Sequence, residues 1–206
     1  MKLYHHPLSP NARKAVMAAS LLGVELELSL VDILTGANQA PQYLKLNPMG
    51  KVPTLVDGGL VLWESSAIML YLADKTPGNA LYPSAPEARA DVNRWLFWAA
   101  THWSPNCAML IQQNMIKKMM GKGDPDPSIV ALEEGELTRF GKVLDDQLAT
   151  RDYLCGPELT LADLAVSAPF MYAVPGKLPV EKLGNVQRWF ARIQNLAAWK
   201  KTTPAT

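Results

Sequence analysis

Two short segments carry polar side chains at positions where a helix is expected to begin. Residues 9–11 (S-P-N) follow a short apolar segment, and residues 64–66 (E-S-S) precede an apolar run at 67–73. A helix N-terminus exposes backbone N–H groups without intrahelical acceptors, and its dipole favours negative charge. Hydroxyl and amide groups there could hold a carboxylate or a thiolate. The same residue types are also ordinary helix caps, so both interpretations stay open.

Other chemical patterns do not indicate a site. His5 and His6 are adjacent in an expected strand, where successive side chains point to opposite faces, so they cannot easily chelate one metal. The sequence has no metal-binding His or Cys pair at the usual spacing, no dinucleotide fingerprint and no phosphate loop. Cys107 and Cys155 are too few for a disulfide framework and suit a reducing compartment. We expect no metal.

The composition predicts a cytoplasmic protein that binds neither nucleic acid nor membranes. The chain has 20 Lys and Arg residues against 19 Asp and Glu residues, so no global field attracts a polyanion. Its first seven residues lack the apolar segment of a secretory signal. The longest uncharged apolar stretch, residues 164–174, has about half the length of a membrane span and contains Pro169.

The first part of the chain mixes strand and helix patterns. An Asp-Gly-Gly turn at 57–59 joins two short apolar runs as a hairpin, and Gly23 ends the first helical pattern. We expect Ser65 or Ser66 to cap the helix after the hairpin. The order β-α-β-α-β-β-α predicts a four-stranded mixed sheet covered by helices. Strands are expected at 2–5, 25–31, 54–56 and 60–63, and helices at 11–22, 40–45 and from 67.

The second part of the chain reads as an all-helical bundle. Residues 78–85 form a turn-rich linker between a domain at 1–77 and a domain at 86–206. Pro105 should bend or divide the first long helix. Residues 160–163 (T-L-A-D) look like a capping box that opens another helix. Helices are expected at 87–103, at 128–149, after 160 and at 185–200.

Four motifs in this order resemble those of the cytosolic glutathione transferase family, in a bacterial-type form with serine in the first-helix motif. They are residues 8–14 (L-S-P-N-A-R-K), 47–53 (N-P-M-G-K-V-P), 64–68 (E-S-S-A-I) and 160–163 (T-L-A-D). Each motif alone is weak, but four in register are strong, and the resemblance covers essentially the whole chain. The resemblance implies a thioredoxin-like N-terminal domain followed by an all-helical C-terminal domain.

The resemblance also implies a binding site for glutathione, used as co-substrate. The Val52-Pro53 bond should be cis, leaving the Val52 N–H and C=O free to pair with an extended tripeptide. Without the resemblance, Pro53 would be a trans proline that opens an edge strand. Ser65 should receive the γ-glutamyl carboxylate, Glu64 the ammonium group, and Lys51 the glycyl carboxylate. Ser65 could also be only a helix cap.

Ser9 and Asn11 are the residues that the resemblance assigns to the glutathione sulfur. A hydroxyl that donates to the sulfur stabilises its thiolate form, and the following helix N-terminus adds a favourable field. Some bacterial relatives with a Thr-Pro-Asn motif look more like disulfide reductases, in which the Asn amide helps to hold the sulfur. Whether Ser9 or Asn11 dominates stays open.

The second substrate should be a small hydrophobic electrophile. The resemblance puts its pocket near the Pro105 break, lined by His102, Trp103, Asn106 and Met109, although ordinary packing also accounts for these residues. The expected activity is a detoxifying conjugation by a homodimer. The alternatives are a glutathione-dependent disulfide reductase or peroxidase and a non-catalytic assembly module of the same fold.

Overall fold

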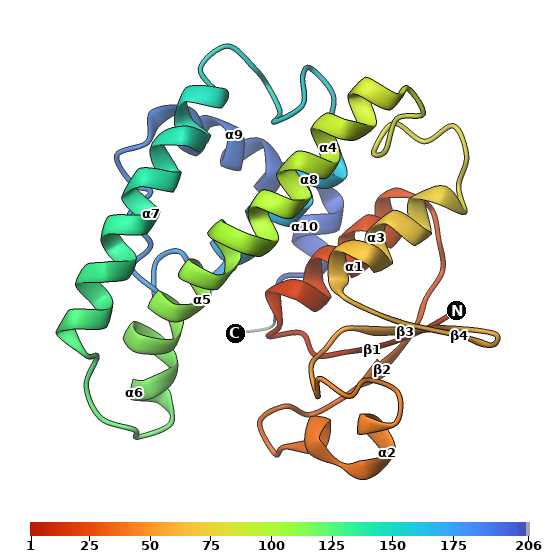
Figure 1. Cartoon of the computed structure of the whole chain (residues 1–206), viewed down its shortest axis with the longest axis horizontal. Helices are drawn as coiled ribbons and strands as arrows, with labels where there is room; N and C mark the ends of the chain where they lie inside the picture. The colour runs from red at the N-terminus through yellow and green to blue at the C-terminus, as the bar shows by residue number, and fades with distance from the viewer. Residues whose placement is uncertain (205–206) are drawn as a thin grey trace. The chain divides into compact units, whose positions relative to one another are not determined.

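A four-stranded mixed sheet lies in the N-terminal part of the chain in the computed structural model, which describes residues 1–204. The strand order is β2-β1-β3-β4, with β1 parallel to β2 and β3 antiparallel to both β1 and β4. Helices α1 and α3 lie on one side of this sheet and α2 on the other (Figure 1). The element order confirms the predicted β-α-β-α-β-β-α arrangement. The strands are β1 Lys2–His5, β2 Glu27–Leu30, β3 Thr54–Asp57 and β4 Leu60–Trp63, and the helices are α1 Pro10–Leu21, α2 Pro41–Leu44 and α3 Ser65–Asp74.

The two central strands and the two long helices share one apolar core. Leu3 of β1 is paired with Leu55 of β3, and both side chains are fully buried. Each such leucine contributes about 2 kcal/mol by leaving water. Ala15 and Ala19 present small side chains from α1 to this core, which allows the helix to lie close to the sheet and to α3.

The chain divides into two units, and the first includes the C-terminal end. One unit contains Met1–Ser84 together with the segment that begins at Leu196, and the other contains Ala85–Asn195. The expected helical domain at 86–206 therefore differs from the structure at its C-terminal end. Helix α10, Ala197–Lys201, belongs to the unit that contains α1.

Arg13 explains why α10 packs on α1. Its guanidinium lies 3.7 Å from the centroid of the Trp199 ring, donates to the Trp199 carbonyl at 2.8 Å and to Thr203 Oγ1 at 2.9 Å. A guanidinium that is only 3% exposed requires such partners, and the C-terminal segment supplies them. The expected helix at 185–200 is consequently interrupted at Leu196.

The second unit is helical, as predicted, and its first long helix is divided before Pro105. A π-helical segment separates α4 from α5, and Pro105 lies in the first turn of α5. Proline has no N–H, so the carbonyl of Thr101 cannot receive an α-helical bond from it, and the wider turn accommodates the discontinuity. The helices are α4 Pro86–Trp98, α5 Ser104–Ile111, α6 Lys117–Met119, α7 Pro127–Gln147, α8 Leu161–Ser167 and α9 Gly184–Asn195, with π segments Ala99–Trp103 and Gln112–Ile116.

The predicted capping box at the start of α8 is present and is fully buried at Asp163. The Asp163 carboxylate accepts hydrogen bonds from Thr160 N, Leu154 N and Trp189 Nε1, each at 2.9 Å. Burial raises the pKa of Asp163, and these donors oppose that shift by stabilising its charged form. One carboxylate therefore ties α8 to α9 and to the loop before it.

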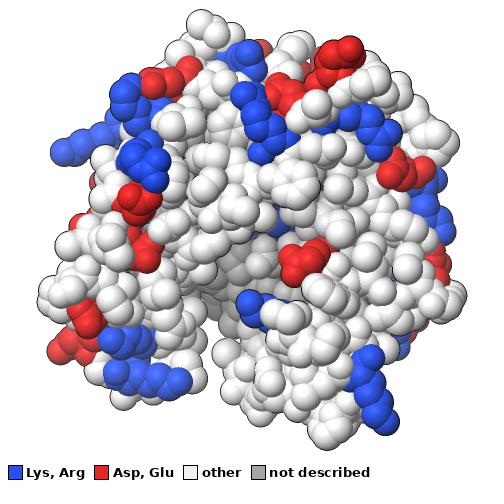
Figure 2. All heavy atoms as spheres, viewed as in Figure 1, with Lys and Arg blue, Asp and Glu red and all other residues white. Residues whose placement is uncertain are grey.

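Charged side chains of both signs are interspersed over the face shown in Figure 2. That distribution agrees with the near balance of acidic and basic residues in the sequence. Within residues 1–204, no helix combines the length and the apolar character needed to cross a bilayer.

Asp163→Ala should lower the free energy of unfolding by about 3 kcal/mol, because several buried donors lose their acceptor at once. Thr160→Ala should cost about 1 kcal/mol, as for the loss of an ordinary helix cap. Urea melts followed by circular dichroism measure both effects. Asp146→Ala is the matched control, because that exposed carboxylate forms a surface ion pair with Lys142 and no other among residues 1–204. Equal, small effects of Asp163→Ala and Asp146→Ala would contradict the anchoring role.

Candidate ligand-binding site at two helix N-termini

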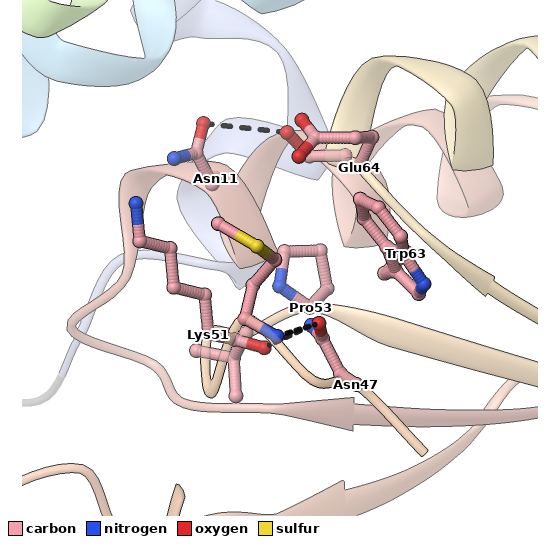
Figure 3. A pocket seen from close by; sticks show the side chains of 9 residues that line it. Asn11, Asn47, Lys51, Pro53, Trp63 and Glu64 are labelled. Carbon is pink, nitrogen blue, oxygen red and sulfur yellow. Dashed lines mark hydrogen bonds between the residues drawn. The ribbon is translucent and has the colours of Figure 1, made fainter. Parts of the chain in front are cut away.

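A pocket opens in the first unit at the end of the sheet where α1 and α3 begin. Lys51 lies on one side, Glu64 and Trp63 lie on the other, and Pro53 lies between them (Figure 3). A cation and an anion therefore stand at opposite sides of one cavity. The lining residues are Asn11, Asn47, Met49, Lys51, Val52, Pro53, Trp63, Glu64 and Ser65.

A buried polar network fixes the turn that precedes Pro53. Asn47, only 2% exposed, donates from Nδ2 to the Lys51 carbonyl at 2.7 Å and to Thr54 Oγ1 at 3.1 Å. The Tyr43 hydroxyl also donates to the Lys51 carbonyl at 2.7 Å. Asn47 Oδ1 in turn accepts from the backbone N–H of Met49 at 3.0 Å. These bonds hold the backbone on both sides of Val52 in one arrangement.

Gly50 is required by the same turn. Its φ of 59° lies in the left-handed region, and an added Cβ would lie 2.5 Å from Gln39 Nε2. The Gly50 carbonyl accepts from Asn38 Nδ2 at 2.7 Å. Glycine therefore serves both the backbone conformation and the close approach of the neighbouring loop.

The Val52-Pro53 bond is cis, which confirms the prediction. Val52 lines the pocket, and among residues 1–204 its backbone N–H and C=O have no hydrogen-bond partner. The residue as a whole is 8% exposed. The pocket wall thus offers one free donor and one free acceptor on a backbone fixed from both sides.

Helix α3 begins at Ser65, whereas a serine cap at residue 65 or 66 would have placed its first residue at 66 or 67. Glu64, not Ser65 or Ser66, is the N-cap residue, and its φ of 72° turns the chain from β4 into the helix. Ser65 is consequently the first helical residue. The first intrahelical hydrogen bond runs from Ile68 N to Glu64 O at 3.0 Å, so the N–H groups of the residues before Ile68 have no acceptor within the helix. These groups are open to an anion.

Ser9 and Asn11 take different places at the start of α1. Ser9 is the N-cap, and its Oγ accepts from Ala12 N at 3.2 Å. Asn11 lines the pocket, and its Oδ1 accepts a hydrogen bond from Ser65 Oγ at 3.3 Å, the upper dashed line in Figure 3. Ser9 is not among the lining residues of this pocket. The structure therefore brings Asn11, Glu64, Ser65, Lys51 and the Val52-Pro53 turn together in one pocket wall that does not include Ser9.

Lys14 is a buried cation beside this site that sequence reasoning missed. Its side chain is 3% exposed, and Nζ donates to Ser66 Oγ at 3.3 Å. Burial lowers the pKa of Lys14 to about 8, and the negative charge of Glu64 partly opposes this shift. The available signal was that Lys14 lies beside Ala15 in a helix whose following residues, 15–19, are all apolar. Asn47, Met49 and Trp63 also line the pocket, although the sequence analysis gave them no role at the site; Asn47 and Met49 belong to the motif at 47–53.

The predicted electrophile-pocket residues lie on the π segment and α5 of the second unit. His102 and Met109 are exposed, and Asn106 is half-buried with its amide donating to the His102 carbonyl. Trp103 differs from the prediction: it is fully buried, stacks on Trp98 with ring centroids 5.7 Å apart and donates from Nε1 to the Val166 carbonyl at 3.0 Å. Trp103 is a core residue whose side chain has no exposed surface with which to line a pocket.

Both cysteines lie in the second unit and are poor nucleophiles. Burial raises the pKa of Cys155 to about 12 and raises that of Cys107 well above its ordinary value. Neither belongs to the pocket described above. In the described part of the chain, no three His, Cys, Asp or Glu residues are grouped so that they could hold a metal ion.

Comparisons with known proteins give one family for both parts of the chain. Residues 1–74 match the family model described as "Glutathione S-transferase, N-terminal domain", and residues 113–197 match "Glutathione S-transferase, C-terminal domain". The chain is 35% identical over 212 residues to glutathione S-transferase 3 of Zea mays, an alignment that covers 100% of this chain and 94% of that protein.

Solved structures agree with these matches. Glutathione transferase F7 from Populus trichocarpa superposes with a TM-score of 0.90 at 27% identity, covering 98% of this chain and 96% of that one. A theta class glutathione S-transferase from Xanthomonas axonopodis pv. citri, determined with glutathione bound, gives a TM-score of 0.85 at 33% identity and covers 100% of this chain and 97% of that one.

Asn47→Ala should lower the free energy of unfolding by about 2 kcal/mol, because the Lys51 carbonyl, the buried Thr54 hydroxyl and the Met49 N–H each lose a partner. Thermal melts of the purified variant measure this loss. Gln42→Ala is the control, because Gln42 is an exposed side chain in the neighbouring helix α2. An Asn47→Ala melt that overlays that of Gln42→Ala would contradict the proposed network.

Neither cysteine should react readily in the folded protein. With an aromatic disulfide reagent at about pH 8, labelling should be about a hundredfold slower than in urea-denatured protein, because raised pKa values leave little thiolate. The released chromophore measures the rate. Rapid native labelling of one equivalent would show that a cysteine is available for chemistry.

Proposed function

The chain belongs to the glutathione S-transferase family, and from this premise we propose that it conjugates the thiolate of glutathione to small hydrophobic electrophiles. The observation that carries the proposal is the pocket with an unpaired backbone donor and acceptor at Val52 between a cation and an anion. Glutathione is an extended tripeptide with carboxylates at both ends and an ammonium group at one of them. The pocket offers a partner of suitable charge for each of these groups.

The ligand's polar groups can be assigned to individual residues. The cysteinyl backbone of glutathione pairs with the free N–H and C=O of Val52, as a short added strand beside Pro53. The γ-glutamyl carboxylate takes the open N–H groups and the hydroxyl of Ser65, while Glu64 meets the ammonium group. Lys51 has no ion-pair partner within residues 1–204, and it receives the glycyl carboxylate.

The thiol must ionise before it can react. A free thiol has a pKa near 8.5, so about 3% is thiolate at neutral pH, and lowering that pKa by about two units requires about 2.7 kcal/mol. One charge-assisted hydrogen bond contributes about 1.5–3 kcal/mol, and a helix N-terminus adds about 0.3–1 kcal/mol. Ser9 can donate its hydroxyl hydrogen to sulfur while its oxygen accepts from Ala12 N, a bond that strengthens it as a donor.

The reaction then needs no nucleophile from the protein. The thiol proton leaves to solvent, the sulfur lone pair forms a bond to the electrophilic carbon, and the leaving group departs with its bonding electrons. Ser9 and Asn11 stabilise the sulfur charge and are not consumed. His102, Asn106 and Met109 are the residues proposed to meet the electrophile, with Trp103 supporting them from the core.

We also propose that the protein is a cytoplasmic homodimer of the bacterial type. Family members usually pair with the ligand site near the interface, and the sequence carries no charge pattern for a membrane or nucleic acid. Light scattering of the purified protein at micromolar concentration tests the dimer.

A second candidate function is glutathione-dependent disulfide reduction, or a peroxidase reaction of the same type. The observation in its favour is that Asn11, rather than Ser9, lines the pocket. In that reaction, the glutathione sulfur attacks one sulfur of a substrate disulfide, and a thiolate leaves with the bonding electrons. A third possibility, a non-catalytic assembly module, has no need of Glu64, Ser65 or the Val52-Pro53 turn.

Ser9→Ala should lower kcat/KM with an aryl chloride about tenfold to a hundredfold, because the thiolate loses one charge-assisted donor. Asn11→Ala should lower it as well, and the larger of the two losses identifies the dominant residue. Ser20→Ala, at the exposed far end of α1, is the matched control and should retain full activity. Turnover undiminished in both Ser9→Ala and Asn11→Ala would remove these residues from sulfur activation.

The wild-type protein should conjugate the aryl chloride faster than it reduces hydroxyethyl disulfide. Both rates are measured with the same enzyme preparation at saturating glutathione. Efficient disulfide reduction with negligible conjugation would establish the second function instead. Failure to bind glutathione at millimolar concentration would favour the assembly module.

A further inference from the structure

Lys14 is a buried ammonium whose hydrogen-bond partner belongs to the first turn of α3. Its Nζ donates to Ser66 Oγ, one residue from Ser65 in the pocket wall. Lys14 forms no ion pair with any carboxylate among residues 1–204, and Glu64 acts on it only through its field. The cation therefore lies directly behind the helix end that is proposed to hold a carboxylate.

A buried ammonium whose hydrogen-bond partner is a hydroxyl and not a carboxylate is costly to the folded protein. Burying a charge without an ion-pair partner is unfavourable, and an apolar side chain would suit the alanine-rich surface of α1 better. The burial that lowers the pKa of Lys14 is a direct expression of that cost. An anion bound at the start of α3 would relieve it, since opposite charges in a poorly solvated place attract strongly.

We propose that Lys14 is a positioning residue for the γ-glutamyl end of glutathione, an inference that rests on the proposed function. Its ammonium holds the Ser66 hydroxyl and supplies positive charge behind the first-turn N–H groups of α3. The lysine acts through Ser66 and through its field, without direct contact with the ligand. It should therefore affect glutathione affinity more than turnover.

The proposed role of Lys14 makes the affinity for glutathione depend on pH, and the direction of this dependence follows from the position of the charges. Glu64, at the turn before α3, raises the pKa of Lys14 against the larger lowering by burial; the other charged side chains of α1 and of α10, which packs on it, are Arg13, Lys200 and Lys201. A bound carboxylate favours the protonated lysine. The affinity for glutathione is then highest below the pKa of Lys14 in the free protein, which is about 8, and it declines as the pH rises above that value.

The experiment is calorimetric titration with S-methylglutathione, which has no ionisable thiol, at about pH 6.5 and about pH 9.5. The wild-type protein should bind about tenfold more weakly at the higher pH. Lys14→Met should bind about tenfold more weakly than wild type at the lower pH and should lose less affinity than wild type on going to the higher pH. Lys14→Arg, whose charge does not titrate, should also decline less than wild type, because only the ammonium group of the ligand then loses its proton over this range.

Lys45→Met is the matched control, because Lys45 is an exposed lysine of the same unit, and it should behave like wild type. Kinetics should show a raised KM for glutathione in Lys14→Met with kcat nearly unchanged. If Lys14→Met does not fold, judged by circular dichroism, the difference in pH profile between wild type and Lys14→Arg decides the question.

Two results would overturn the inference: Lys14→Met binding within about twofold of wild type with the same pH profile, or Lys14→Arg following the wild-type decline. Either result leaves the proposed function intact, because the wild-type protein still binds the tripeptide. Absence of wild-type binding at both pH values would instead refute the proposed function.

Discussion

Helices α1 and α3 begin at the same end of the sheet, and the Ser65 Oγ to Asn11 Oδ1 hydrogen bond joins their first turns. Two helix N-termini in one place bring together open N–H groups and the positive ends of two dipoles. That arrangement suits a ligand with more than one negative group. The alanines of α1 make it possible, because larger side chains at Ala15 and Ala19 would separate the helix from the sheet and from α3.

The other wall of the pocket depends on a backbone that is fixed yet unpaired. Asn47 Nδ2 and the Tyr43 hydroxyl both donate to the Lys51 carbonyl, and the Tyr43 hydroxyl is also hydrogen-bonded to the Thr54 hydroxyl on the other side of the turn. Because these buried polar groups satisfy one another, the N–H and C=O of Val52 stay available to a ligand. A ligand strand can then bind without first ordering the loop, which is the usual benefit of preorganisation.

The sequence predicts most of the fold, because its signals are local. The hairpin turn, the capping box at Thr160 and the Pro105 break each follow from two to four neighbouring residues, and the structure has all three. The C-terminal boundary was not predictable in this way, because it depends on Arg13 meeting Trp199 far along the chain.

The site was predicted only in part, because only some of its residues belong to local sequence motifs. Lys51, Glu64 and Ser65 follow from motifs, and the structure brings them into one pocket. The cap of α3 was assigned to a serine because propensity favours serine, whereas the positive φ of Glu64 is set by the turn out of β4. The family resemblance predicts Trp103 in the electrophile pocket, but its neighbours in the helical core bury it. Lys14 and Asn47 act through contacts that only the folded chain creates.

The central claim is that the two helix N-termini and their side chains stabilise a bound thiolate. The most direct test is an ultraviolet absorbance titration of the glutathione sulfur in the complex, with the protein's own absorbance subtracted. The account predicts that the bound thiol ionises about two pH units below its free value of about 8.5. A midpoint equal to that of glutathione in buffer would contradict it.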